Sequence, residues 1–167
     1  MDKCHEEFDN TVREAHFGLL TCDLKSAKYS PRGNNCPVLN KKEGKETDHD
    51  PIDLQHWALV VHFPRGVKTF LFEAGQNQDR KLEPGRGEVD IELYNRSIGI
   101  GTCLTSPRQL LEIACSLPFN CTEYSVLDNN CQVWAQHFIK RVSPTLAQQL
   151  KLILSDKRPG SVFDVLD

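Results

Sequence analysis

Long hydrophobic runs are missing from this chain of 167 residues. No stretch approaches the 18 or so consecutive apolar residues of a membrane helix, so we expect no transmembrane segment. The first ten residues, MDKCHEEFDN, lack the apolar run of a secretory signal, and we therefore expect a cytoplasmic protein. No block of Lys and Arg stands out and the formal net charge is -3, which does not favour nucleic acid as a partner.

The seven cysteines lack the close Cys-x-x-Cys pairs that structural zinc sites use. Their number is odd and no export signal accompanies them, which indicates reduced, intracellular thiols rather than a disulfide framework. A group of ligand-type side chains near the N-terminus matches no known ligand spacing: Cys4, His5, His16 and Cys22. We therefore expect no metal site and no organic cofactor.

The length fits one domain preceded by an extension. Residues 31–51 hold three prolines, two glycines and many charges, which predicts a loop or linker. We therefore expect an N-terminal extension with a polar linker at residues 1–50 and a folded domain at residues 51–167. A loose helical stripe lies in the extension, at Phe8, Val12, Phe17 and Leu20.

A hairpin is predicted directly after His56. The run WALVVHF, residues 57–63, is almost entirely apolar and rich in branched side chains, which is typical of a strand buried on both faces. A Pro-Arg-Gly turn signal follows, and VKTFLFEA at residues 67–74 predicts the second strand. Three weaker predictions complete this region: a polar loop at 75–87, an alternating strand at 88–95, and a strand or loop at 97–103.

Helices are predicted in the second half of the chain. Ser106-Pro107 and Ser143-Pro144 each place a capping serine before a proline at the first helical position. Between them, CQVWAQHFIKRV at residues 131–142 has an apolar face that includes Trp134, so that Trp134, like Trp57, is expected in the core. Together these patterns predict an α+β domain with a small antiparallel sheet packed against helices.

Cys131 is the cysteine with the strongest chemical case. It lies at the first turn of its predicted helix, after three residues that all cap helices well. The partial positive charge and free N–H groups of a helix N-terminus favour a thiolate, and the same N–H groups can form half of an oxyanion hole. The alternative is a packed cysteine, because free cysteine is among the most buried residue types.

A thiol nucleophile needs a base, and His56 at the start of the central strand is the best-placed histidine. A turn centred on Pro64-Arg65 would place Glu73 directly opposite His56, within reach of a hydrogen bond that orients the imidazole. His62 sits at the turn end of the same strand, and His137 faces away from Cys131 on the helix. The alternative for His56 is a solvated imidazole at a strand end.

His56-Trp57-Ala58 before an apolar strand resembles the His-Trp-Ala opening of the lecithin:retinol acyltransferase-like family. Asn130-Cys131, opening an amphipathic helix, resembles the Asn-Cys motif of that family and of the PPPDE-type desumoylating isopeptidases. Both belong to the circularly permuted papain-like superfamily, with the bacterial NlpC-type peptidases, and in all of them the histidine precedes the cysteine. The resemblance covers roughly residues 53–142 and implies a circularly permuted papain-like fold with Cys131 as nucleophile and His56 as base.

The implied activity is a thiol hydrolase that cleaves an amide, isopeptide or ester bond through a thioester, acting on a protein or peptide substrate or on a lipid ester. Glu73 stands where the acyltransferase-like family has a second histidine, and the C-terminal membrane anchor of many members is not seen. The first departure counts against an acyltransferase more than against a hydrolase. In the hydrolase, Glu73 would orient His56, and Gln55 is a weakly supported oxyanion donor. Three alternatives remain open: a thiol acyltransferase with lipid or amine acceptors, a binding module in which Cys131 is merely packed, and an oxidation-sensing regulatory factor.

Overall fold

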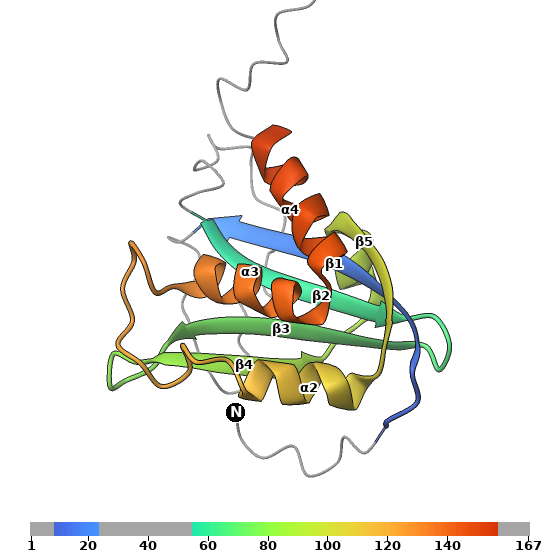
Figure 1. The fold of residues 1–167 in the computed structure, drawn as a ribbon, viewed down its shortest axis with the longest axis horizontal. Helices are drawn as coiled ribbons and strands as arrows, with labels where there is room; N and C mark the ends of the chain where they lie inside the picture. Colours follow the sequence, from blue (N-terminus) through green and yellow to red (C-terminus); the bar gives the residue numbers. More distant parts are fainter. Residues whose placement is uncertain (1–8, 24–54, 157–167) are drawn as a thin grey trace, which may run out of the picture.

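The computed structural model describes residues 9–23 and 55–156 (Figure 1). The strands in these ranges are β1 (Arg13–Asp23), β2 (Gln55–Phe63), β3 (Lys68–Gln76), β4 (Leu82–Glu88) and β5 (Ile98–Thr105). The helices are α1 (Ile91–Asn95), α2 (Pro107–Cys115), α3 (Cys131–Val142) and α4 (Pro144–Asp156). The predicted α+β class, with a small antiparallel sheet and helices packed against it, is confirmed.

The strands form one sheet in the order β4-β3-β2-β1-β5, and every neighbouring pair is antiparallel. The predicted hairpin is confirmed as β2 and β3, joined by a turn at residues 64–67. Strand β2 has neighbours on both sides, and from His56 to Phe63 all its side chains are buried. Its continuous apolar run is explained by this central position, which leaves neither face in contact with water.

Strand β1 corrects the prediction for the extension. Residues 13–23 do not form a helical stripe but pair with β2 on one side and with β5 on the other. Ala15, Phe17 and Leu19, at a spacing of two, face the main core. The sheet therefore begins inside the segment assigned to the extension, while the predicted linker at 31–51 lies outside the described residues.

Two further predictions between β3 and β5 were wrong. Residues 82–87, part of the predicted loop at 75–87, belong to β4, an edge strand that pairs only with β3 and can therefore accommodate Pro84. The alternating segment 88–95 contains helix α1 instead of a strand, because the Asp90 side chain accepts a hydrogen bond from Glu92 N–H at 2.9 Å and caps the turn.

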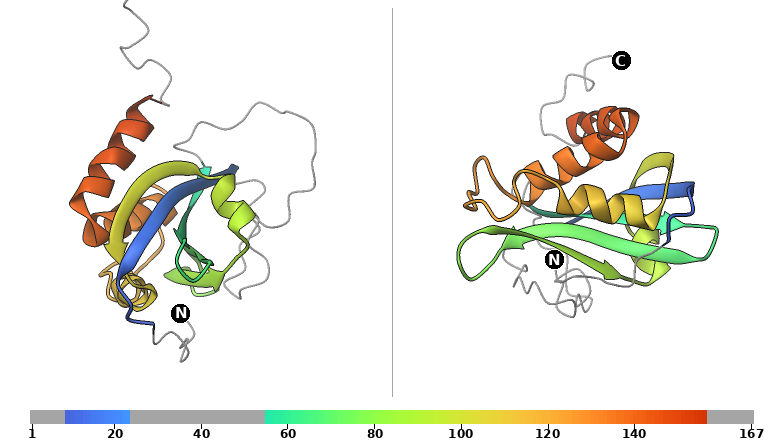
Figure 2. Two further views of the ribbon diagram at one scale, coloured as in Figure 1. Left: turned by 90° about the vertical axis from the view of Figure 1, so that its right-hand side faces the viewer. Right: turned by 60° about the horizontal axis from the view of Figure 1, so that its bottom comes forward.

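Helices α2, α3 and α4 cover one face of the sheet and enclose the main core (Figures 1 and 2). Trp57 and Trp134 are both buried there, as predicted. The opposite face carries a smaller apolar cluster, in which Leu93 of α1 packs against Ala58 and Val60. The start of β2 therefore lies between two packed layers, where a polar side chain is shielded from water.

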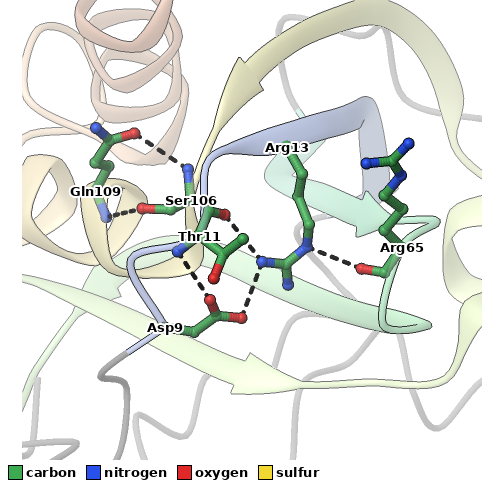
Figure 3. A network of polar contacts seen from close by, with 6 residues as sticks. All are labelled: Asp9, Thr11, Arg13, Arg65, Ser106 and Gln109. Atoms are coloured by element: carbon green, nitrogen blue, oxygen red, sulfur yellow. Dashed lines mark hydrogen bonds and ion pairs between the residues drawn. The ribbon is translucent and has the colours of Figure 1, made fainter.

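Arg13 holds the end of the sheet at which β1 begins and the β2–β3 turn lies (Figure 3). Its Nε donates to the carbonyl oxygen of Arg65 in the β2–β3 turn at 2.8 Å, and its Nη1 donates to the Thr11 carbonyl at 3.0 Å. An ion pair with Asp9 at 2.9 Å and the ring of Phe63 below the guanidinium complete the site. These contacts fix the start of β1 against the hairpin.

Candidate functional site

Helix α3 begins at Cys131, as predicted, because Asn130 caps it. The Asn130 Oδ1 accepts hydrogen bonds from Gln132 N–H at 2.9 Å and Val133 N–H at 3.0 Å. Its Nδ2 donates to the Val126 carbonyl at 2.6 Å, which ties the helix start to the preceding loop. Cys131 is only 3% exposed and is the first residue of the helix.

A contact that the sequence did not reveal joins this helix to the sheet. The Gln132 Nε2 donates to the backbone carbonyl of Gln55 at 2.8 Å. Gln55 is the first residue of β2, so this bond holds the start of α3 against the start of β2. The result is that Cys131 and His56, 75 positions apart in the sequence, are adjacent.

The sulfur of Cys131 is surrounded by hydrogen-bond donors. The His56 side chain bonds to it, and the backbone N–H groups of Trp57 and Gln132 donate to it. Burial raises the pKa of the Cys131 thiol, but the hydrogen bond and charge of His56, together with the two N–H donors, outweigh burial and leave the pKa below its ordinary value. This environment favours a thiolate.

The imidazole of His56 is held from its other side by Glu73. The His56 Nε2 lies 2.9 Å from Glu73 Oε2, so Nδ1 is the ring nitrogen left for Cys131. His56 is 5% exposed, and burial alone lowers its pKa. The hydrogen bonds and charges of Cys131 and Glu73 reverse that effect and raise the pKa of His56 to about 9. Both shifts favour the charged form of each group, which biases the pair toward thiolate and imidazolium.

The predicted contact between His56 and Glu73 is present, but the predicted register of the hairpin was wrong. Glu73 lies directly opposite Ala58, two residues further along β2 than expected. A shift of two residues keeps the same face of the sheet, whereas a shift of one would have turned Glu73 away. The long glutamate side chain then reaches His56 diagonally.

Tyr124 is the site residue that sequence reasoning missed. Its hydroxyl hydrogen-bonds both to the side chain and to the backbone N–H of Cys131. Burial, the charge of Cys131 and the hydrogen bond to its side chain together raise the pKa of Tyr124 to about 12, although the bond from the backbone N–H lowers it. Tyr124 lies in the irregular segment between α2 and α3, where the sequence pattern gives no indication of which way a side chain points.

The other predicted histidines lie elsewhere. The Nδ1 of His62 is 2.9 Å from Thr69 Oγ1, at the turn end of β2 and about 20 Å of strand away from His56. His137 is exposed on α3 and packs against Phe119. This agrees with the prediction that it faces away from Cys131. The other described cysteines form no disulfide: Cys22, Cys103, Cys115 and Cys121.

Residues 9–23 and 55–156 were also searched for metal-binding groups and for membrane-spanning helices. No group of three or more His, Cys, Asp and Glu side chains there is arranged to hold a metal ion. No helix in these ranges is long and apolar enough to cross a membrane.

Comparison of this chain with protein-family models, with curated proteins and with solved structures gave no match.

Proposed function

We propose that this protein is a thiol hydrolase of the circularly permuted papain-like type, in which Cys131 is the nucleophile, His56 the acid–base residue and Glu73 the residue that orients it. One observation carries the proposal: an uninterrupted line of contacts from the Cys131 sulfur through the His56 imidazole to the Glu73 carboxylate. This is the arrangement of nucleophile, base and orienting group that acyl-transfer enzymes use on unrelated folds.

The reaction follows from the protonation states. The Cys131 thiolate attacks a carbonyl carbon, so that the S–C bond forms while the π electrons of the carbonyl move to its oxygen. When the tetrahedral intermediate collapses, the bond to the leaving amine or alcohol breaks, and the His56 imidazolium supplies the proton that this group needs. Water then attacks the thioester, His56 takes a proton from it, and the acid is released with the thiol regenerated as thiolate.

Burial argues against a merely packed cysteine. The side chains of His56 and Glu73 are 7% and 13% exposed, and their Nε2 and Oε2 atoms are in hydrogen-bond contact. Placing an imidazole and a carboxylate in the protein interior costs free energy that an apolar pair would not cost. Buried titratable groups with strongly shifted pKa values are typical of functional sites.

The substrate class in this proposal is an amide, isopeptide or ester carbonyl, carried by a protein, a peptide or a lipid ester. A thiol acyltransferase would share every step up to the thioester and would differ only in the acceptor, an amine or alcohol in place of water. The contacts around Cys131 concern the shared steps and favour neither acceptor.

The test is alkylation of the native protein with iodoacetamide, read out for each cysteine by mass spectrometry from about pH 4 to about pH 9. We expect Cys131 to react faster than the exposed Cys115 and Cys121 and to remain reactive below pH 7. His56→Ala should abolish this low-pH reactivity. The matched control is His62→Ala, on the same strand and the same sheet face but away from the sulfur. Slow labelling with an ordinary thiol profile would contradict the proposal.

A further inference from the structure

Two histidines face each other on the side of the sheet that carries α1. His16 of β1 is paired directly with His62 of β2, and their ring centroids are 6.3 Å apart. Tyr94 of α1 lies against both rings, with its centroid 6.2 Å from that of His16 and 5.6 Å from that of His62. The three rings therefore form a contact between helix and sheet, and two of them belong to the residue type that titrates near neutral pH.

The polar groups around the two imidazoles come from the neighbouring strands. On β3, the Thr69 Oγ1 lies 2.9 Å from the His62 Nδ1. On β1, the Glu14 Oε1 lies 2.8 Å from the His16 Nε2. Helix α1 contributes Tyr94. Within residues 9–23 and 55–156, no carboxylate forms an ion pair with His62, so a positive charge on its ring has no counter-ion there.

This environment opposes a positive charge on His62. The residue is 7% exposed, and burial together with the charge of His16 lowers the pKa of His62. Like charges at directly opposite positions of neighbouring strands are destabilising. The cluster of His16, His62 and Tyr94 is therefore most stable when the His62 ring is neutral.

Helix α1 is the part of this contact that can give way. It has five residues, Ile91–Asn95, and a helix of this length depends on tertiary contacts for its stability. Those contacts are Leu93, which packs against Ala58 and Val60, and the Tyr94 ring. Strands β1 and β2, in contrast, each pair with a strand on both sides. Movement of α1 away from the sheet would let water reach the imidazoles without breaking a strand pair.

We propose that the facing pair of His16 and His62 is an acid-sensitive switch that holds α1 on the sheet when His62 is neutral and releases it when His62 is protonated. The switch takes up one proton and changes no covalent bond. Its release would uncover the apolar side chains of Ala58 and Val60. The inference is independent of the proposed function of Cys131.

The direction of the pH dependence follows from the two states of His62. With α1 released, the ring is solvated and its pKa returns to the ordinary value of about 6.5. With α1 in place, the pKa is lower, so the released form binds the proton more tightly. The closed form therefore keeps its full stability above about pH 6.5 and loses stability as the pH falls below that value. For one proton, the opening equilibrium changes by at most about tenfold per pH unit.

Native-state hydrogen exchange, followed by NMR for each residue from about pH 7.5 to about pH 5, measures this opening. The amides of Leu93, Arg96 and Ser97 report on α1, because each is bonded to a carbonyl within residues 90–94. After correction for intrinsic exchange rates, their opening constants should rise below about pH 6.5, by up to about tenfold per pH unit. The amide of Ser116, bonded to Glu112 at the end of α2, is the internal control and should keep a constant opening equilibrium.

Three variants separate His62 from other titrating groups. His62→Gln removes the titrating ring but keeps a donor and an acceptor for Thr69, and the acid-induced opening of α1 should disappear. His16→Gln keeps His62 and removes the charge that faces it, so the titration of the His62 ring should move to higher pH and the opening should become weaker. His137→Gln is the matched control, because His137 is exposed on α3, and it should leave the response unchanged. Circular dichroism checks that each variant is folded.

Any of three results would overturn the inference. The first is an opening equilibrium of α1 in the wild type that does not depend on pH. The second is an acid response that persists in His62→Gln. The third is an equal response at the Ser116 amide, which would show a general loss of stability in place of a local release of α1. None of these measurements involves Cys131, so their failure would leave the proposed thiol chemistry standing, and an unreactive Cys131 would leave the switch standing.

Discussion

His56 and Glu73 are in contact across a diagonal of the β2–β3 hairpin: their Nε2 and Oε2 atoms lie 2.9 Å apart, although Glu73 is paired directly with Ala58. The diagonal matters for the chemistry because the carboxylate occupies Nε2 and leaves Nδ1 for Cys131. It also keeps the carboxylate out of reach of an incoming carbonyl carbon in the proposed mechanism, since the imidazole stands between the two. Glu73 therefore acts on the sulfur through His56.

The first prediction concerns Glu73→Gln, which keeps the side-chain shape and removes the charge. Burial lowers the pKa of His56, and Glu73 is one of the two groups that reverse this and raise it to about 9. Without the carboxylate the pKa of His56 should fall, and a less readily charged imidazole stabilises the thiolate less. The pH midpoint of Cys131 alkylation should therefore move to higher pH, and the titration of the His56 ring, followed by NMR, should move to lower pH.

The matched control for this charge removal is Glu112→Gln. Glu112 forms an exposed ion pair with Arg108 at 2.8 Å, four residues apart on α2. It should leave the alkylation profile of Cys131 unchanged. An unchanged midpoint in Glu73→Gln itself would show that Glu73 has no part in setting the state of the sulfur.

The second prediction compares two helix caps. Asn130→Ala removes the acceptor for the N–H groups of Gln132 and Val133, whereas Ser106→Ala removes the capping box of α2. Each should cost about 1 kcal/mol of unfolding free energy, measured by urea denaturation. Only Asn130→Ala should also move the alkylation midpoint of Cys131 to higher pH, because only α3 carries the nucleophile. Equal alkylation profiles in both variants would contradict a role of this helix start in activating the thiol.

The features predicted correctly from the sequence are those determined locally. The start of α3 at Cys131 depends on the cap at Asn130 and on an apolar stripe within the helix itself. The contact of His56 with Glu73 was predicted although the register was wrong, because the error was an even number of residues.

The features missed depend on partners far away in the sequence. Strand β1 is short of local strand signals and is a strand because β2 and β5 pair with both its edges. Pro84 and the glycines of β4 indicated a loop, and only the edge position in the sheet allows them in a strand. Tyr124 lies in an irregular segment, where no period relates a side chain to a direction.

The third prediction concerns the tether between helix and sheet. Gln132→Ala removes the hydrogen bond from Gln132 Nε2 to the Gln55 carbonyl, which holds α3 against the start of β2. We expect a loss of about 1 kcal/mol in unfolding free energy. The acylation rate with 4-nitrophenyl acetate should fall about tenfold or more, because small displacements of a nucleophile from its base are costly. Gln136→Ala, one turn further along the same helix and exposed, is the control and should leave the rate unchanged. A wild-type acylation rate in Gln132→Ala would argue that the cap at Asn130 alone positions Cys131.

The last prediction separates stability from chemistry. Arg13→Leu should remove the donors for the carbonyls of Arg65 and Thr11 (Figure 3). It should also remove the contact of the guanidinium with the Phe63 ring. We expect the unfolding free energy, measured by urea denaturation, to fall by about 1–3 kcal/mol, because the two partly buried carbonyls lose their partners. Arg108→Leu, which breaks only an exposed ion pair, should cost no more than about 0.5 kcal/mol.

Arg13 lies at the opposite end of β1 from Cys22, the residue that pairs with His56. Ten residues of strand span about 30 Å, so the loss of Arg13 cannot reach the sulfur through direct contacts. Under conditions where Arg13→Leu is fully folded, the alkylation profile of Cys131 and its acylation rate should therefore equal those of the wild type. A shifted Cys131 profile in the folded variant would mean that the whole sheet, and not the local contacts of His56, Tyr124 and Gln132, sets the state of the thiol.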